Sequence, residues 1–196
     1  MINRDTDTRR HILATGRRLT ARQGYSGVGL NELLKTAGVP KGSFYHYFVS
    51  KEAYGCAVLE DFVLEYNAKL TSSLDSPTLN ARARLLAYFE GWHQNQISNN
   101  PEDRCLIVKL SAEVADLSKD MSEILQQGVS ATVARLTETL DDGIAEGSIG
   151  LIKDTNAMAA AIYHQWLGAS LVASLSHNDA AFKLAMHTTK KLVSNP

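Results

Sequence analysis

One short stretch of the chain, KGSFYHY, gathers side chains that could bind a polyanion. Lys41 supplies a positive charge, while Ser43, Tyr45 and His46 supply hydrogen-bond donors suited to phosphate oxygens. Gly42 leaves room for another backbone to approach closely. A helix that began at Lys41 would add the free N–H groups of its first turn, which also favour anions. This combination of residue types predicts binding to phosphates.

The charge of the chain is distributed unevenly. The 196 residues carry a formal net charge of −1. The first 55 residues hold nine lysines and arginines against four acidic residues, whereas the remainder holds eleven against seventeen. A basic head on an acidic body indicates that the head meets a polyanion. A solvated charged helix would carry the same charges, so the balance alone leaves both interpretations open.

Patterns for catalysis or metal binding are missing from the sequence. It contains no phosphate-binding G-x-x-x-x-G-K-[ST], no H-E-x-x-H and no C-x-x-C, and its six histidines show no ligand spacing. The run GYSGVG resembles a nucleophile elbow only superficially, because Val28 occupies the place where a glycine is needed. We therefore expect no enzyme, no catalytic residue, no cofactor and no metal.

Nearly every segment has helical periodicity, and strand-like alternation is absent. The fold class predicted is all-α with about nine helices, divided into a three-helix head at 1–50 and a helical body at 51–196. Predicted helices cover residues 6–23, 30–36, 41–48, 51–74, 79–95, about 100–117, 118–145, 156–176 and 179–194.

The second and third predicted helices are short and separated by a tight turn, AGV, which is typical of a helix-turn-helix motif. Gly38 supplies left-handed freedom to the turn, and Pro40 suits the start of the next helix. In this motif the N-terminal residues of the second helix face base edges in the major groove. The head is therefore predicted to bind double-stranded DNA.

The rings in FYHYF are predicted to divide between the core and the DNA. Phe44 and Phe48 share one helix face at a spacing of four residues, so we expect both to be buried. Tyr45 and His46 point elsewhere and are expected to contact DNA. Tyr47 could bind phosphate or lie partly in the core.

The run GVGLNELLKTAGVPKGSFYHYFVSKEAYGCAVLE resembles the DNA-binding segment of TetR-family transcriptional repressors. The resemblance implies that Lys41, Gly42 and Ser43 face bases or nearby phosphates and that Lys51 binds phosphate. It also implies a homodimer on palindromic operator DNA, because one head reads only a few base pairs. Small residues that would permit close approach of two helices occur at Ala157, Ala160, Ala161, Gly168, Ala169, Ser170 and Ala173. The same residues would also suit packing within one chain.

The segment EDRCLIVKLSAEVADLS resembles a subgroup of that family, the repressors of the N-ethylmaleimide-reductase type, which sense electrophiles and reactive chlorine. The resemblance implies that Cys105 is the sensing thiol. From the residues alone, Cys105 lies just past the first turn of a helix that starts near Asn100, where the helix dipole weakly favours thiolate. The alternative is a buried, inert cysteine. Cys56 is interpreted as a packing residue.

One position departs from the subgroup. Its members carry a lysine that pairs chemically with the sensing cysteine, and Ser174 stands at the matching position here. Simple alkylation or oxidation of Cys105 is therefore the expected reaction. The function predicted is a repressor that leaves its operator when an electrophile or oxidant acts at Cys105.

The alternative inducer is a non-covalent small hydrophobic ligand. Candidate lining residues for its pocket are Tyr88, Trp92, His93, Tyr163 and Trp166, although aromatic residues at helical spacing also suit an ordinary core. No apolar run reaches membrane-spanning length, and two cysteines make no disulfide framework. We therefore expect a cytoplasmic protein that does not enter a membrane.

Overall fold

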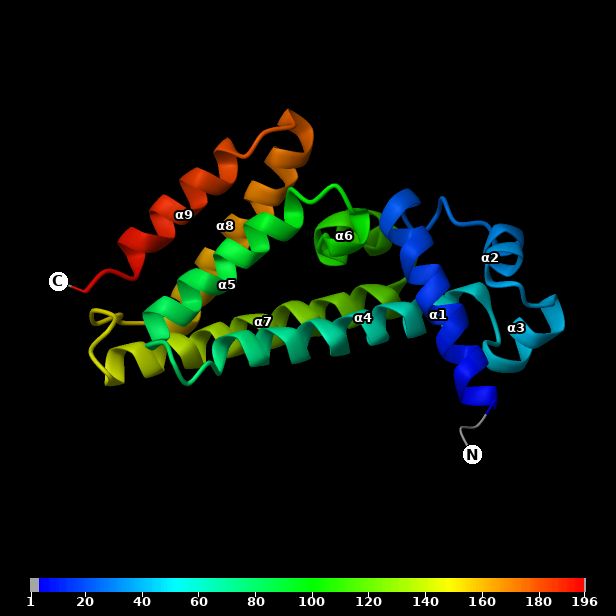
Figure 1. The fold of residues 1–196 in the computed structure, drawn as a ribbon, viewed down its shortest axis with the longest axis horizontal. Helices are drawn as coiled ribbons and strands as arrows, with labels where there is room; N and C mark the ends of the chain where they lie inside the picture. Colours follow the sequence, from blue (N-terminus) through cyan, green and yellow to red (C-terminus); the bar gives the residue numbers. More distant parts are fainter. Residues whose placement is uncertain (1–3, 196) are drawn as a thin grey trace. The chain divides into compact units, whose positions relative to one another are not determined.

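The computed structural model describes residues 4–195, with side chains from residue 7 onward. Within that range the chain forms nine α-helices and one 3-10 turn and no strand, which confirms the all-α prediction (Figure 1). In chain order these are α1 (Arg4–Gln23), α2 (Leu30–Ala37), α3 (Lys41–Tyr47), α4 (Lys51–Leu74), α5 (Ala81–Gln96), the 3-10 turn η1 (Pro101–Asp103), α6 (Leu106–Leu117), α7 (Lys119–Ala145), α8 (Thr155–Ser176) and α9 (Ala180–Leu192).

The helices form two compact units. The first contains the chain up to Glu65 together with Asn99–Gln127, and the second contains Tyr66–Ser98 together with the chain from Gly128 onward. Helices α4 and α7 each contribute to both units. The predicted division after residue 50 rests on expected roles and not on compact packing, and it stays a prediction.

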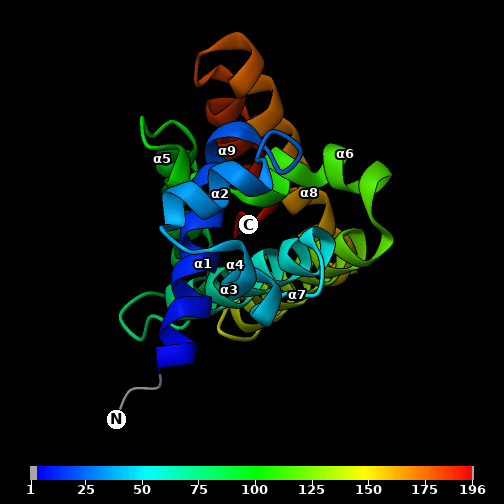
Figure 2. The same ribbon diagram turned by 90° about the vertical axis from the view of Figure 1, so that its right-hand side faces the viewer.

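The first unit has a core shared by α1, α2, α3 and the start of α4. Its central members include Ile12, Leu33, Phe44 and Tyr54, each of which is almost completely buried. Figures 1 and 2 show α1, α2 and α3 next to one another. Because α3 has only seven residues, it is too short to be a stable helix alone and depends on this core.

The second unit packs α5, α8 and α9 together, and α8 and α9 form an antiparallel pair (Figure 1). The rings of Phe89 and Trp166 stack with centroids 4.7 Å apart. The indole N–H of Trp166 donates to Thr189 Oγ1 at 3.0 Å, and that of Trp92 donates to Ser170 Oγ at 2.9 Å. Both buried indole N–H groups therefore have a hydrogen-bond acceptor, so these large rings fill the core without leaving an unpaired polar group.

Capping side chains fix several helix ends. Ser50 Oγ accepts the N–H of Ala53 at 3.0 Å, which is the bond of a serine N-cap at the start of α4. The prediction that the next helix starts at residue 79 is wrong by two residues. Asn80 is the N-cap of α5, because its Oδ1 accepts the N–H of Ala83 at 2.8 Å.

Candidate functional site

The turn between α2 and α3 has the geometry of a helix-turn-helix. Gly38 ends α2 with φ 65° and ψ 28°, a left-handed conformation that favours glycine. The N–H of Val39 donates back to the carbonyl of Leu34 at 3.1 Å, which closes the end of α2. Pro40 is extended, with ψ 154°, and leads directly into α3. Three residues thus redirect the chain from one short helix to the next.

Phe44 and Phe48 anchor α3 to the head. Their side chains are 0% and 3% exposed, which confirms that they belong to the core. Their ring centroids lie 5.2 Å apart, and both contact the ring of Tyr54 on α4, at 5.4 Å from Phe44 and 5.3 Å from Phe48. The buried rings therefore set the orientation in which α3 presents its other side chains.

The predicted base-contacting and phosphate-contacting residues lie on the remaining surface of α3. Lys41, Gly42, Tyr45 and His46 are exposed, and Ser43 is half-buried. The Lys41 Nζ lies 5.8 Å from the centre of the Tyr45 ring, which brings a cation and a phenol together at the start of the helix. The structure thus places these donors together on one side of a helix whose other side is buried.

Tyr47 and Lys51 lie at the far end of the motif. Tyr47 is half-buried and packs on the head core, with its ring centroid 4.8 Å from that of His46. Lys51 is the first residue of α4, and its Nζ lies 4.9 Å from the centre of the Tyr25 ring. The hydroxyl of Tyr25 donates to the Lys51 carbonyl at 2.8 Å, which fixes the start of α4. Their contacts with phosphate stay a prediction.

Arg17 on α1 has a partner within the protein. Its guanidinium pairs with the carboxylate of Glu65 and lies 5.4 Å from the centre of the Phe62 ring. Arg9 remains exposed and lies 5.5 Å from the centre of the Phe48 ring, close to α3. Of these two arginines, Arg9 is the one placed to reach a phosphate near the motif.

Cys105 is the N-cap of α6, so the prediction that it lies past the first turn of a helix starting near Asn100 is wrong. Asn100 instead caps the separate 3-10 turn η1, where its Oδ1 accepts the N–H of Glu102 at 3.2 Å. Arg104 is extended, with ψ 149°, and interrupts the helix. The turn packs against α1, and Arg22 pairs with Glu102 at 3.5 Å. This tertiary contact favours a separate turn over a longer helix.

The pKa of the Cys105 thiol also differs from the expectation that the helix start favours the thiolate. Burial raises the pKa of its thiol from 9.0 to about 11. The nearby backbone N–H groups of Val108 and Ile107 act in the opposite direction and lower that pKa, but they do not offset the loss of water. The side chain is only 9% exposed. Burial likewise raises the pKa of the half-buried Cys56.

Four of the five candidates for a ligand pocket are buried in the second unit, namely Tyr88, Trp92, Tyr163 and Trp166, and His93 beside them is half-buried. Trp92 and Trp166 donate to neighbouring hydroxyls as described above, and the Tyr88 hydroxyl lies 2.5 Å from that of Tyr66. His93 lies against the Phe182 ring, with centroids 4.9 Å apart. Tyr163 packs edge-on against Trp92 at 5.6 Å. Their role in binding a ligand stays a prediction.

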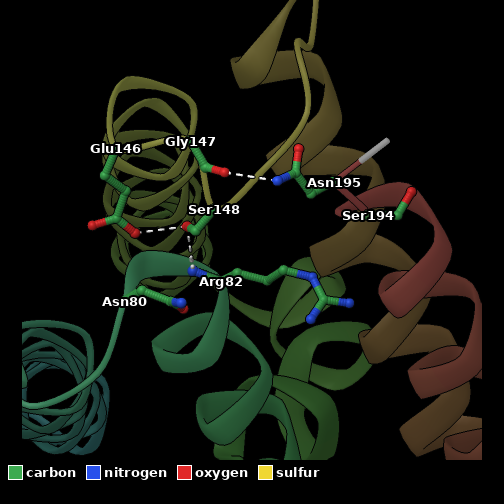
Figure 3. A pocket seen from close by; sticks show the side chains of 7 residues that line it. All are labelled: Asn80, Arg82, Glu146, Gly147, Ser148, Ser194 and Asn195. Carbon is green, nitrogen blue, oxygen red and sulfur yellow. Dashed lines mark hydrogen bonds between the residues drawn. The ribbon is translucent and has the colours of Figure 1, made fainter.

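A polar cavity of about 670 Å³ lies elsewhere in the second unit (Figure 3). It is lined by Asn80, Arg82, Glu146, Gly147, Ser148, Ser194 and Asn195. Ser148 Oγ donates to Glu146 at 2.6 Å, and the Asn195 amide donates to the Gly147 carbonyl at 2.9 Å. These groups bond to one another, and the bond from Asn195 to Gly147 joins the C-terminal segment to the turn that follows α7.

Two residues important to the head were missed by sequence reasoning. Glu113 on α6 accepts hydrogen bonds from the N–H groups of Tyr25 and Ser26, in the turn after α1. Tyr25 in turn holds the start of α4. The contact from Glu113 to Tyr25 joins residues 88 positions apart, and no local pattern in the sequence signals it.

Comparisons with known proteins agree with this geometry. A family model described as bacterial regulatory proteins, tetR family, matches residues 12–53, and one described as tetracyclin repressor-like, C-terminal domain, matches residues 81–189. The chain belongs to the TetR family. Regulators of the TetR family bind operator DNA and act as dimers, and this chain is accordingly a DNA-binding transcriptional regulator.

Individual relatives of this TetR-family chain cover almost its whole length. It is 42% identical over 190 residues to the HTH-type transcriptional repressor NemR of Escherichia coli K12, covering 97% of this chain and 96% of NemR. A crystal structure of reduced E. coli NemR superposes with a TM-score of 0.92, covering 97% and 98% of the two chains. The HTH-type transcriptional repressor DhaR of Mycobacterium sp. GP1 is 30% identical over 173 residues, covering 88% and 85%. The resemblance drawn from the sequence is thereby confirmed.

The relatives are transcriptional regulators of the TetR family, a class that is in general non-enzymatic. Among residues 4–195, every helix is either too short or too polar to cross a lipid bilayer. The same part of the chain contains no group of three or more His, Cys, Asp or Glu that could hold a metal ion.

Proposed function

We propose that this regulator is a repressor that leaves its operator when an electrophile or oxidant modifies Cys105. The observation that carries the proposal is the place of Cys105 in the fold. It is the N-cap of α6 and lies in the same compact unit as the DNA-binding helices α2 and α3. The likeness to the repressor NemR over 97% of the chain supports the same function.

The chemistry needs only the thiol of Cys105, the reagent and water. The sulfur of the thiolate attacks the electron-poor alkene carbon of a reagent such as N-ethylmaleimide, the displaced electron pair moves to the adjacent carbon, and that carbon takes a proton from water. With hypochlorous acid the thiolate sulfur instead bonds to chlorine and hydroxide leaves, and water then displaces chloride from the sulfenyl chloride to give the sulfenic acid. Neither step needs a lysine, so both reactions can proceed with serine at position 174.

An adduct at Cys105 would strain its surroundings. The side chain is only 9% exposed, and protein interiors are too closely packed to accept a new group without movement. The nearest elements that can move are η1 and the first turn of α6, because Arg104 between them is not helical. Modification is therefore expected to displace the start of α6.

The DNA-binding side of the proposal uses the exposed surface of α3. Lys41, Gly42, Ser43, Tyr45 and His46 would meet bases or nearby phosphates. Tyr47 and Lys51 would hold adjacent phosphates, which fixes the register of the head. Two heads in a dimer would read palindromic half-sites about 34–36 Å apart or a multiple of that spacing.

A gel shift with operator DNA, in the presence and absence of N-ethylmaleimide, tests the proposal. DNA binding is expected to be lost in the wild type and retained in Cys105→Ser, and Cys56→Ser serves as the matched control that should still respond. Equal loss in the wild type and in Cys105→Ser would refute the role of Cys105. Release of DNA by unreactive hydrophobic compounds alone would instead favour a non-covalent inducer.

A further inference from the structure

The carboxylate of Glu113 joins α6 to the DNA-binding head. Its Oε2 accepts the backbone N–H of Tyr25 at 3.1 Å, and its Oε1 accepts the backbone N–H of Ser26. Tyr25 and Ser26 lie in the turn that connects α1 to α2. One side chain from the middle of α6 thus holds two consecutive backbone groups just before the helix-turn-helix.

The turn is shaped to receive this carboxylate. Gly24 ends α1 with φ 79°, a conformation that favours glycine. A Cβ atom at position 24 would lie 2.9 Å from Glu113 Oε2, closer than side chains normally approach. The carboxylate therefore lies directly against the backbone at position 24, where a larger residue would have to displace it.

Charge strengthens the contact. Partial burial raises the pKa of Glu113, but hydrogen bonds from the Ser26 hydroxyl and from the N–H groups of Ser26 and Tyr25, together with the charge of Lys109, hold it below its ordinary value. Glu113 is consequently ionised at neutral pH. Hydrogen bonds to an ionised acceptor are about twice as strong as those between neutral groups.

Helix α6 also meets the head at its C-terminal end. Ser118, which follows α6, donates its hydroxyl to the carboxylate of Glu52 at 2.6 Å, in the first turn of α4. The chain segment between the two contact points, from Ser26 to Glu52, contains both α2 and α3. A displacement of α6 therefore acts on both ends of the segment that binds DNA.

We propose that Glu113 is the positioning residue that transmits a displacement of α6 to the helix-turn-helix. The displacement caused by a Cys105 adduct rests on the proposed function, whereas the coupling of α6 to the head requires only that the head binds DNA. A contact that merely stabilised the fold would lower the melting temperature without changing how DNA binding and the state of α6 depend on one another.

Hydrogen exchange of the α6 amides tests the coupling without any electrophile. Operator DNA is expected to slow exchange in α6 of the wild type by about fivefold or more, the lower end of ordinary allosteric coupling. Glu113→Gln keeps the size of the side chain and one acceptor oxygen, so the head should stay folded while the effect of DNA on α6 falls to about twofold or less. Asp116→Asn, an exposed carboxylate on the same helix, is the matched control and should behave as the wild type.

Two outcomes of this experiment overturn the inference. One is an effect of DNA on α6 that is as large in Glu113→Gln as in the wild type. The other is wild-type protein whose α6 does not respond to DNA at all. Should Glu113→Gln bind DNA too weakly, Glu113→Asp, which keeps the charge but shortens the reach, offers a second variant expected to lose the coupling in the same way.

The gel shift with N-ethylmaleimide separates failure of this inference from failure of the proposed function. If the wild type releases DNA after modification and Glu113→Gln, equally modified, does not, both ideas are supported. If both proteins release DNA equally, Cys105 senses the reagent but Glu113 is not the link. If the wild type is modified and keeps its DNA, sensing at Cys105 fails, while the exchange experiment still decides the role of Glu113.

Discussion

Substitution of two neighbouring rings on α3 tests whether one side of this helix stabilises the fold while the other binds DNA. Phe44 is 0% exposed and contacts Phe48 and Tyr54, whereas Tyr45 is 46% exposed on the surface of α3 that is proposed to bind DNA. We compare Phe44→Ala with Tyr45→Phe. The first removes a buried ring and leaves the surface of α3 chemically unchanged, while the second removes one exposed hydroxyl and leaves the core unchanged.

The two substitutions should separate stability from affinity. Loss of a fully buried phenylalanine costs about 3–5 kcal/mol of the free energy of unfolding. For a chain of this size that corresponds to a fall of roughly 6–20 °C in Tm. Removing an exposed hydroxyl should change Tm little. If that hydroxyl donates to a phosphate, its loss costs about 1.5–3 kcal/mol of binding, or roughly tenfold to 150-fold in affinity for each head.

Thermal unfolding and fluorescence anisotropy with labelled operator DNA measure the two effects, at one fixed salt concentration because phosphate binding depends strongly on salt. Tyr45→Phe is expected to melt as the wild type and to bind DNA at least tenfold more weakly. Wild-type affinity in Tyr45→Phe would refute the proposed contact. An unchanged Tm in Phe44→Ala would refute the account of α3 as a helix held by its buried rings.

Three further predictions follow from single contacts. Tyr54→Phe should raise the free energy of unfolding by about 1 kcal/mol, because the hydroxyl is buried against Gly16 and has no hydrogen-bond partner among the described residues; a lower Tm would contradict this. The alkylation rate of Cys105 in Cys56→Ser protein, followed by mass spectrometry, should rise about tenfold per pH unit beyond pH 9, and a plateau below pH 9 would show a more acidic thiol than burial implies. The stabilisation contributed by Glu113, whose pKa is lowered in the folded state, should be complete above its ordinary value of 4.5 and be lost as the pH falls through the folded value. The difference in Tm between wild type and Glu113→Gln should therefore shrink in acid, whereas a difference independent of pH would exclude this origin.

Most of the fold could be predicted from the sequence because its signals are local. Gly38 and Pro40 mark the turn of the motif, and the helix predicted from residue 51 starts at the residue where the structure places α4. The spacing of Phe44 and Phe48 is likewise local, and it correctly divides α3 into a buried and an exposed side. Local patterns determine such features because the interactions that carry them lie within a few residues of one another.

The position of Cys105 relative to the start of α6 could not be predicted because it depends on tertiary structure. The run from Asn100 to Asp103 has the composition of a helix start, but its contact with α1 makes it a separate turn and moves the start of α6 to Leu106. The burial of the thiol matches the alternative that the sequence left open, because free cysteine is among the most buried residue types. The predicted favourable effect of a helix N-terminus is present, but burial acts in the opposite direction and is larger.

These opposing effects bear on how a buried thiol could act as a sensor. With a pKa of about 11 in place of 9.0, the thiolate of Cys105 is about 100-fold scarcer near neutral pH. The N–H groups of Ile107 and Val108 would still favour the thiolate if the start of α6 shifted far enough to admit water. One movement would then both expose the sulfur and increase its ionisation. Because Glu113 holds the same helix to the turn before α2, the conformation that reacts fastest would also be the one in which the head is displaced, and an adduct would trap the chain in that state.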